Sequence, residues 1–407
     1  MIIVERHFRS GTPEIIQLCS TSKELYNKCN FYIRQSYFNN KPLPSLNELT
    51  NIVIKEDCFK NLHNTKTAKQ TIRKVLTDWS NYFKALKAYK KDPSKFKKYP
   101  KPPYYKKKMA QVIFYNETIK KKPLKEGNIV PTNYCFNIKS DKNFKQVIIT
   151  PKTFGFIIEV QYDQEVKKCK VDKEKVLNID LGVDNLASIT SNQHNPILIN
   201  GRILKSINQW FNKHPNKRNS KKRYFRIENY FHNASKFIID LCIYFHIGTI
   251  IIGRNEGWKQ RVKIRSKNKQ NFQYIPFDNF INKIEYKAKL CGIKVIYTEE
   301  SYTSKASFID RDVMPVYGEE KGEINFSGNR IHRGLYKTKD GLLINADVNG
   351  SANIGRKVIQ DPEFLRQLDR SLAARPITIN PLKVHCGLSN EWLSSLNINS
   401  LTSFCKF

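Results

Sequence analysis

The chain has 407 residues, and its 71 Lys and Arg residues against 36 Asp and Glu residues give a formal net charge of +35. That length is enough for two or three domains, each with its own core. Hydrophobic residues at 40% and aromatic residues at 12% exclude a disordered chain, which could not offset the entropy of folding. No apolar run reaches the ~18 residues that a membrane-spanning helix needs, so no membrane partner is expected.

The positive charge is the first functional clue, because it is spread over the whole chain and is not gathered in a tail. A body that repels itself this strongly is usually offset by a polyanion, and nucleic acid is the commonest one. A membrane-surface protein would concentrate its Lys and Arg residues on one amphipathic helix, and no such helix is visible. The nine cysteines lie at least ten residues apart and form no CxxC pair, which favours a reducing, intracellular location.

The first half of the chain predicts a small β structure interrupted by helices. Strands are expected at residues 3–8, 134–138, 146–150 and 155–162. Apolar residues at three- and four-residue steps predict helices at about 12–38 and 66–90. The strands therefore predict a small barrel into which the helical region is inserted.

Residues 84–125 combine positive charge with aromatic rings. The segment holds 15 lysines and two acidic residues. Lysine neutralises phosphates, and aromatic rings stack on unpaired bases. Several prolines would suit a solvated linker equally well, but the total charge of the chain favours nucleic-acid contact. The residues predicted to make this contact are Tyr104, Tyr105, Lys106, Lys107 and Lys108.

From residue 176 onward strands alternate with helices, which predicts a mixed α/β domain. The expected strands are 176–182, 249–253 and 295–300, with a hairpin through 187–190 and 197–200. Helices are expected at about 203–246, at 277–291 and from near Asp347. An irregular segment, 306–343, precedes the last helix, and the stretch after about Asp361 has no readable chemistry.

Acidic residues stand where elements of this α/β domain end or begin. Asp180 closes the strand in NIDLG, Glu299 and Glu300 end KVIYTEE, and Asp347 opens the helix in ADVNGSANIGRK. Taken singly, each has an ordinary explanation as a turn residue, a solvated pair or a helix cap. Together they supply the oxygen ligands that Mg²⁺ prefers, and two such ions can support phosphodiester hydrolysis. Because side chains alternate along a strand, only one of the two glutamates can face the site.

Four segments resemble a known family. NIDLGVDNLASIT is similar to the first nuclease motif of the transposon-encoded TnpB/OrfB proteins, and ADVNGSANIGRK is similar to their third. NGRILKSINQWFNK and the N-terminal STSKELYNKCNFYIRQSYF resemble two further family segments, and all four occur in the family's order over residues 3–360. The resemblance implies an RNA-guided DNA endonuclease related to type V CRISPR effectors and to Fanzor proteins.

The resemblance also implies a multidomain α+β architecture. It predicts a wedge β-barrel at 1–12 and 116–175, a helical recognition domain at 13–115, an RNase H-like (RuvC) nuclease domain at 176–360 and a C-terminal extension at 361–407. The implied partners are a guide RNA from the transposon end and target double-stranded DNA, which would be cut next to a short flanking motif. The expected location is the cytoplasm of a prokaryotic cell, at the nucleoid, and the sequence does not indicate an oligomeric state.

The second nuclease motif departs from the family pattern. The family usually ends this strand with a glutamate, whereas TIIIGRNEGWKQ has Gly253 there, and glycine cannot bind metal. In rearranged relatives the glutamate stands later, just before a Thr-Ser pair, and Glu300 precedes Thr303 and Ser304 at that offset. The catalytic and Mg²⁺-binding residues implied by the resemblance are thus Asp180, Glu300 and Asp347, with Glu256 and Glu299 as alternatives to Glu300. Two ions are expected, with Asp180 bridging both.

The zinc ribbon of the family is the second departure. Family members usually carry two CxxC pairs between the Thr-Ser pair and the last Asp, but residues 306–343 contain no cysteine. His332 alone cannot replace a four-ligand site, and the adjacent His385 and Cys386 are better explained by polar packing. No zinc is therefore expected.

Three other functions remain open at this point. A chain whose nuclease site is broken would act as an RNA-guided DNA-binding repressor. A DNA-strand transferase with RNase H-like chemistry would bind transposon ends without RNA. A miniature type V CRISPR effector is a close variant of the transposon-encoded RNA-guided endonuclease and would be distinguished from it by a neighbouring repeat array.

Overall fold

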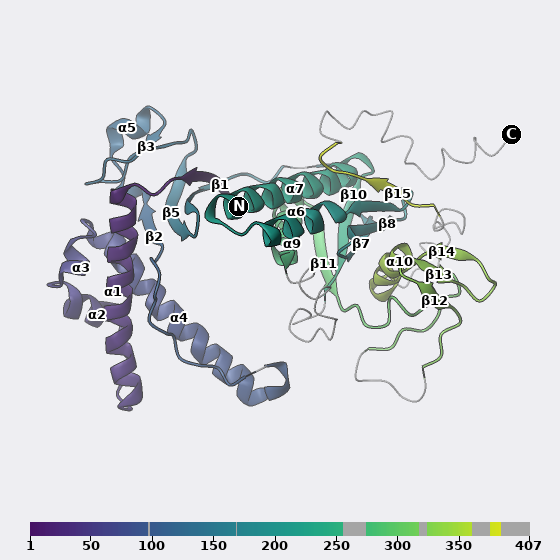
Figure 1. The fold of residues 1–407 in the computed structure, drawn as a ribbon, viewed down its shortest axis with the longest axis horizontal. Coiled ribbons are helices and arrows are strands. Elements are labelled where there is room, and N and C mark those ends of the chain that lie inside the picture. Colours follow the sequence, from purple (N-terminus) through teal and green to yellow (C-terminus); the bar gives the residue numbers. More distant parts are fainter. Residues whose placement is uncertain (97, 168, 255–273, 317–323, 360–374, 384–407) are drawn as a thin grey trace. The chain divides into compact units, whose positions relative to one another are not determined.

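The computed structural model describes residues 1–96, 98–167, 169–254, 274–316, 324–359 and 375–383. The chain divides into two compact units, Met1–Glu165 and Val166–Phe407. Each contains helices and strands (Figure 1), so the multidomain mixed architecture expected from the sequence is observed. Among the described helices, none is long and apolar enough to cross a bilayer.

The first unit is built on a four-stranded antiparallel sheet. Its strands are β1 (Ile2–Arg9), β6 (Gly155–Asp163), β5 (Phe144–Lys152) and β2 (Val112–Tyr115), in that order across the sheet. A two-stranded ribbon, β3 (Asn128–Ile129) with β4 (Ile138–Lys139), and the short helix α5 (Lys121–Lys125) complete the β part. The closed barrel expected from the sequence stays a prediction.

The strand expected at 134–138 is wrong, because only its last residue belongs to a strand, β4. Tyr134 is 4% exposed, and its hydroxyl donates to the carbonyl of Leu62 at 3.0 Å. The segment therefore packs against the helical region and is not held by a strand partner.

Four helices of the first unit lie between β1 and β2 in the chain. They are α1 (Pro13–Phe38), α2 (Leu46–Val53), α3 (Asp57–Lys60) and α4 (Thr65–Lys91). The side chain of Thr12 accepts from the amide of Ile15 and caps α1, while Asn64 caps α4 through the amides of Lys66 and Thr67. The long helices therefore begin where the sequence supplies a capping side chain.

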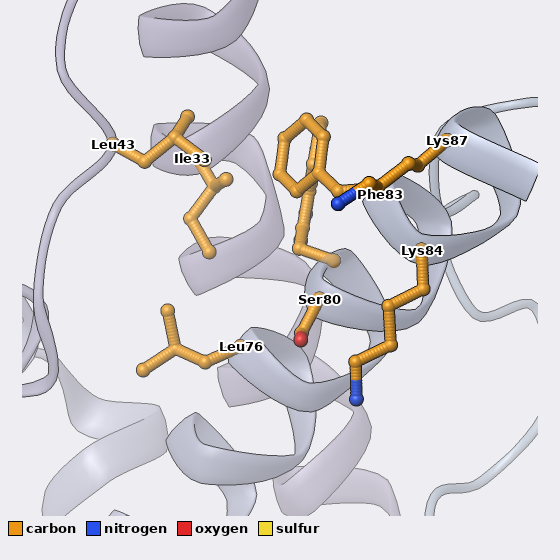
Figure 2. Close-up of a pocket in the computed structure, with 8 residues that line it drawn as sticks. Ile33, Leu43, Leu76, Ser80, Phe83, Lys84 and Lys87 are labelled. Atoms are coloured by element: carbon orange, nitrogen blue, oxygen red, sulfur yellow. The ribbon is translucent and has the colours of Figure 1, made fainter. Parts of the chain in front are cut away.

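Trp79 on α4 is the centre of the contact between α1 and α4. It is 1% exposed, and its indole N–H donates to the side chain of Asn30 at 2.8 Å. Beside it, an apolar cavity of about 410 Å³ opens between these helices (Figure 2), lined by Ile33, Leu43, Leu76 and Phe83, with Lys84 and Lys87 also lining it.

The second unit is built on a six-stranded mixed sheet. Its strands are β11 (Lys294–Thr298), β10 (Ile247–Gly253), β7 (Asp172–Leu181), β8 (Asn185–Ser191), β9 (Ile197–Asn200) and β15 (Ile377–Ile379), in that order. β7, β8 and β9 pair antiparallel, whereas β10 is parallel to β7 and β11 is parallel to β10. β15 comes from the C-terminal extension and pairs with β9.

Among the residues that the structure describes, four helices accompany this sheet: α6 (Arg202–Lys213), α7 (Lys217–Tyr244), α9 (Phe277–Leu290) and α10 (Ala346–Val358). The helical pattern expected at about 203–246 forms two helices, α6 and α7. Pro215 follows the end of α6, and Asn216 then caps α7 by accepting from the amide of Asn219.

The segment expected to be irregular, 306–343, contains strands. β12 (Asn329–His332), β13 (Leu335–Lys337) and β14 (Leu343–Asn345) form a small antiparallel sheet that leads directly into α10. Figure 1 shows α10 among these strands and apart from α6, α7 and α9.

Side-chain alternation along β7 determines which residues face α10. Leu177 and Ile179 are fully buried in the core formed with α7 and α9. Asn178 and Asp180 point the other way, toward α10. The strand pattern thus directs Asp180 at the helix that carries Asp347.

Candidate active site

Asp180, Glu300 and Asp347 come from three separate elements of the second unit. Asp180 is the last residue but one of β7, Glu300 follows the end of β11, and Asp347 lies in the first turn of α10. Because β10 lies between β7 and β11 and is parallel to both, the two strand ends reach the same edge of the sheet. The charges of Glu300 and Asp347 both act on Asp180, so the three carboxylates lie near one another at that edge.

Two glycines allow α10 to approach β7 closely. A Cβ atom on Gly350 would lie 2.8 Å from Oδ2 of Asp180, and one on Gly355 would overlap the side-chain amide of Asn178. Ser351 adds a hydrogen bond from its hydroxyl to the carbonyl of Asn178, at 3.0 Å. Glycine disfavours a helix by about 1 kcal/mol relative to alanine, so the close approach explains its presence here.

The asparagines of α10 hold the turn that follows β11. Asn349 donates to the carbonyl of Ala306 at 2.8 Å, and Asn353 donates to the carbonyl of Thr303 at 2.9 Å. The hydroxyl of Thr303 in turn donates to the carbonyl of Glu300 at 2.9 Å. The helix that carries Asp347 therefore also fixes the backbone at Glu300.

Glu300 fills the space that a side chain at position 253 would take. Gly253 ends β10, and its register partner on β11 is Thr298, two residues before Glu300. A Cβ atom on Gly253 would lie 2.8 Å from both Cγ and Oε1 of Glu300. A glutamate from the turn after β11 thus fills the space over the end of β10, where β10 itself has a glycine.

The site disfavours negative charge, and this shifts two carboxyl groups. Burial raises the pKa of Asp180 well above its usual value, and the nearby charges of Glu300 and Asp347 raise it further. Burial, with a smaller contribution from Glu299, raises the pKa of Glu300 to about 7. Carboxyl groups in this state gain most from a nearby cation, which would favour their charged forms.

Glu299 is held away from this cluster by Lys357 near the end of α10. The two side chains form an ion pair, and that of Lys357 is only 9% exposed. Burial acts to raise the pKa of Glu299, but hydrogen bonds from Lys357 and Ser301 outweigh it and lower the pKa below its usual value. Of the two adjacent glutamates, Glu300 faces Gly253 and Glu299 faces Lys357.

Arg330 on β12 brings a positive charge to the site. Its guanidinium lies 3.4 Å from Oδ1 of Asp347, and Asn185 donates to Oδ2 of the same carboxylate at 2.8 Å. A cavity of about 480 Å³ opens here, lined also by His332 and Arg333. The β12–β13 hairpin therefore presents basic side chains in a cavity that Asp347 also lines.

The donor set fits magnesium in its chemistry. All three side chains offer oxygen ligands, and the charges of Glu300 and Asp347 act on the carboxyl group of Asp180. Within the described residues, however, no three His, Cys, Asp or Glu side chains are close enough together to hold an ion by themselves. Mg²⁺ commonly completes its ligand shell with water and substrate phosphate, which such an open set permits.

The basic and aromatic residues predicted in the first unit differ in accessibility. Tyr104 and Tyr105 are exposed, as are Lys107 and Lys108. Lys106 is partly buried, with its ammonium 4.1 Å from the centre of the Tyr26 ring and 3.9 Å from a carboxylate oxygen of Asp78. Four of the five predicted contact residues are thus open to a ligand, whereas Lys106 already has an acidic partner.

Two of the sequence-predicted positions lie outside the described residues. Glu256, an alternative third carboxylate, is one, and the His385–Cys386 pair is the other. His332 lies on β12, and its ring Nδ1 is 3.1 Å from the carbonyl of Arg333.

Arg330 and Lys357 were missed by reasoning from the sequence. Arg330 belongs to a segment that was predicted to be irregular. Lys357 is the last residue of the ADVNGSANIGRK motif, in which only Asp347 was given a role. The available signal was the alternation of basic residues in NRIHR and the Arg-Lys pair that closes ADVNGSANIGRK.

Comparison with known proteins relates the second unit to one group. Residues 277–354 match the family model described as the Cas12f1-like TNB domain. The chain is 25% identical over 268 residues to the CRISPR-associated endodeoxyribonuclease Cas12f2 of Micrarchaeota archaeon (strain CG1_02_47_40), covering 59% of this chain and 46% of that protein. It is 28% identical over 246 residues to Cas12f1 of Sulfoacidibacillus thermotolerans, covering 51% and 52%. The chain thus spans about half the length of these curated relatives.

Solved structures were also compared. The cryo-EM structure of a Cas12f1–sgRNA–target DNA complex aligns with 88% of this chain and 100% of its own, at 16% identity and a TM-score of 0.35. The mini-RNA-guided endonuclease CRISPR-Cas_phi3 aligns with 89% and 93%, at 10% identity and a TM-score of 0.35. The chain is therefore similar in sequence to the Cas12f group of CRISPR-associated endodeoxyribonucleases, and its matched domain contains both Glu300 and Asp347.

Proposed function

We propose that this protein is an RNA-guided DNA endonuclease that cuts its target by hydrolysis of phosphodiester bonds. The observation that carries the proposal is the proximity of Glu300 and Asp347 to Asp180, with Glu300 in the space over Gly253. The strand order β11-β10-β7-β8-β9 supports the RNase H-like nuclease fold expected from the sequence. The similarity to Cas12f endodeoxyribonucleases supports the same activity.

The proposed mechanism assigns a task to each residue of the site. Asp180, Glu300 and Asp347 would hold Mg²⁺, which when bound activates water and stabilises the leaving oxygen. Asn185 and Arg330 orient the carboxylate of Asp347 through its two oxygens. Arg330, with Arg333 beside it, would also draw the phosphate backbone of a strand into the cavity.

The partners follow from the charge and from the relatives. A guide RNA would neutralise part of the net charge of +35, and base pairing would supply the target sequence. The sequence resemblance implies a guide RNA from a transposon end. The curated relatives are CRISPR-associated, so a CRISPR guide RNA is the alternative source. Sequencing the RNA that copurifies with the protein distinguishes the two, since a CRISPR guide carries a repeat-derived segment.

The first experiment measures plasmid cleavage by the protein copurified with its RNA. A library with a randomised flanking motif is incubated with Mg²⁺ or with EDTA. We expect cutting beside an enriched motif with Mg²⁺ and none with EDTA, because three uncompensated carboxylates would repel the DNA strand.

Glu300→Gln tests the site itself. We expect the rate of cutting to fall by at least ~10³-fold while motif-specific binding stays, because the amide keeps the shape of the side chain and loses its charge. Glu285→Gln on α9 is the matched control, since Glu285 is exposed and accepts from the hydroxyl of Tyr297 at 3.1 Å. Motif-specific binding without cutting by the unaltered protein would instead support the repressor reading.

A further inference from the structure

We propose that Gly253 and Lys357 act together to select Glu300, and not Glu299, as the third carboxylate of the site. The proposal rests on the proposed function and adds two positioning residues to it. Gly253 leaves the space that Glu300 enters, and Lys357 retains Glu299 on the opposite side of the turn.

The space over Gly253 is occupied by the side chains of Glu300 and Ile354. A Cβ atom there would lie 2.8 Å from two atoms of Glu300 and 2.5 Å from Cδ1 of Ile354. Ile354 is fully buried in α10, and buried side chains are closely packed. Even one methyl group at position 253 must therefore shift these side chains, and Glu300 is the one that the site depends on.

The contact between Lys357 and Glu299 prevents an exchange of the two glutamates. Lys357 is nearly buried, so its ammonium depends on Glu299 for a counter-charge. Without Lys357, the carboxylate of Glu299 would be released beside that of Glu300 and would compete for the same cations. The ion pair thus keeps Glu299 at Lys357 and leaves the space over Gly253 to Glu300.

The backbone between these side chains is fixed independently of both. Asn353 holds the carbonyl of Thr303, and the hydroxyl of Thr303 holds the carbonyl of Glu300. Changes at Gly253 or Lys357 therefore leave the path of the turn in place and alter only which carboxylate enters the site. This separation makes the two residues testable without unfolding the turn.

The test compares Gly253→Ala and Lys357→Met in the full chain with its copurified RNA. The first readout is the Mg²⁺ concentration that gives half-maximal plasmid cleavage. The second is independent of activity: Fe²⁺ with ascorbate and peroxide is added to the complex, and backbone scission near residues 180, 300 and 347 is mapped by mass spectrometry. We expect both variants to need about 10- to 100-fold more cation in both readouts, with motif-specific DNA binding unchanged.

Three further variants separate positioning from simple damage to the fold. Ile252→Val, a mild change in the same strand, is expected to cut like the unaltered protein. Lys357→Arg keeps the counter-charge and should cut nearly as well. Adding Glu299→Gln to Lys357→Met removes the competing carboxylate and should restore most of the lost cation affinity, which a merely structural role of Lys357 would not allow.

The outcomes also separate this inference from the proposed function. If Glu300→Gln cuts normally, the site assignment itself fails. If Glu300→Gln is inactive while Gly253→Ala and Lys357→Met cut and bind Fe²⁺ normally, the nuclease stands and the selection by Gly253 and Lys357 is overturned. Failure of Glu299→Gln to rescue Lys357→Met overturns the part assigned to Lys357.

Discussion

Asp180 is a proposed metal ligand, and one of its carboxylate oxygens also lies in close contact with α10 at Gly350. Its Oδ2 lies where a side chain on Gly350 would begin, so the distance between β7 and α10 is set at the site itself. Burial raises its pKa, two neighbouring carboxyl groups raise it further, and Arg330 acts in the opposite direction. A residue in this position tolerates neither a larger neighbour nor the loss of a nearby positive charge.

His194 gives a pH-dependent prediction away from the site. It is fully buried between β8 and β9, its Nδ1 is 2.8 Å from the carbonyl of Asn195, and burial lowers its pKa to about 4. The unfolded chain binds a proton near pH 6.5 while the folded chain does not, so stability falls as the pH drops from about 6.5 toward 4. Relative to pH 7.5, we expect the free energy of unfolding at pH 5 to be lower by about 2 kcal/mol from this residue.

Urea unfolding of His194→Gln checks the sign of this effect. Glutamine keeps a hydrogen-bond donor but does not titrate in this range. At pH 7.5 the variant should be the less stable protein, and the difference should shrink at pH 5. A difference that stays constant between the two pH values would show that His194 is not the titrating group.

At the scale of elements, α10 organises the site more than any single strand does. Its first turn carries Asp347, its glycines set the distance to β7, and its asparagines bind the turn after β11. The motif ADVNGSAN therefore encodes packing at nearly every position.

Asn353→Ala tests this role of the helix. Asn353 is fully buried and donates to the carbonyls of Thr303 and Ala306 at 2.9 and 2.7 Å. Its loss leaves two buried acceptors without these bonds, so we expect unfolding to become easier by about 1–3 kcal/mol and cleavage to fall with it. Asn282→Ala on the exposed face of α9 is the control, and an equal effect of both variants on thermal unfolding would contradict the prediction.

Hydrophobic periodicity predicted most elements of the fold. Both long helices of the first unit, the strands β7 to β11 of the α/β sheet and the helix at 277–291 lie within a few residues of their expected ranges, whereas β15 of the same sheet was not predicted. The strand expected at 134–138 was an error, because the hydroxyl of Tyr134 binds Leu62 in the turn between α3 and α4 and the segment has no strand partner there. Pro215 follows α6 and divides the helical pattern at 203–246 into two helices.

The site was predictable only in part. The strand pattern directs Asp180 and the helix start positions Asp347, but alternation could not choose between Glu299 and Glu300. That choice depends on the absence of a side chain at Gly253 and on Lys357, which is 58 residues away from Glu299 in the chain. Neither has a local signature, because both arise from the packing of α10 against the sheet.

At the scale of the whole molecule, charge dominates. A net charge of +35 on 407 residues makes binding of nucleic acid strongly dependent on salt. The exposed Tyr104, Tyr105, Lys107 and Lys108 show that part of this basic surface is open to a ligand. A bound guide RNA would cover much of such a surface before DNA arrives.

The free protein and its complex with RNA should differ in their salt dependence. We expect affinity for DNA of random sequence to fall by about 10³-fold or more between 50 and 200 mM KCl for the RNA-free protein, because many phosphate contacts release counterions. The complex with RNA should show a shallower slope, because the RNA has already neutralised part of the charge. Filter binding at four salt concentrations measures both, and equal slopes would mean that RNA and DNA use separate surfaces.

The exchange of space between Gly253 and Glu300 has an evolutionary consequence. A single chain has room for one acidic side chain over the end of β10, supplied either by β10 itself or by the turn after β11. Lineages should therefore carry a glutamate at one of these positions and a small or uncharged residue at the other. Passage between the two states requires paired substitutions, so the two positions should covary among relatives and mark a branch point in their descent.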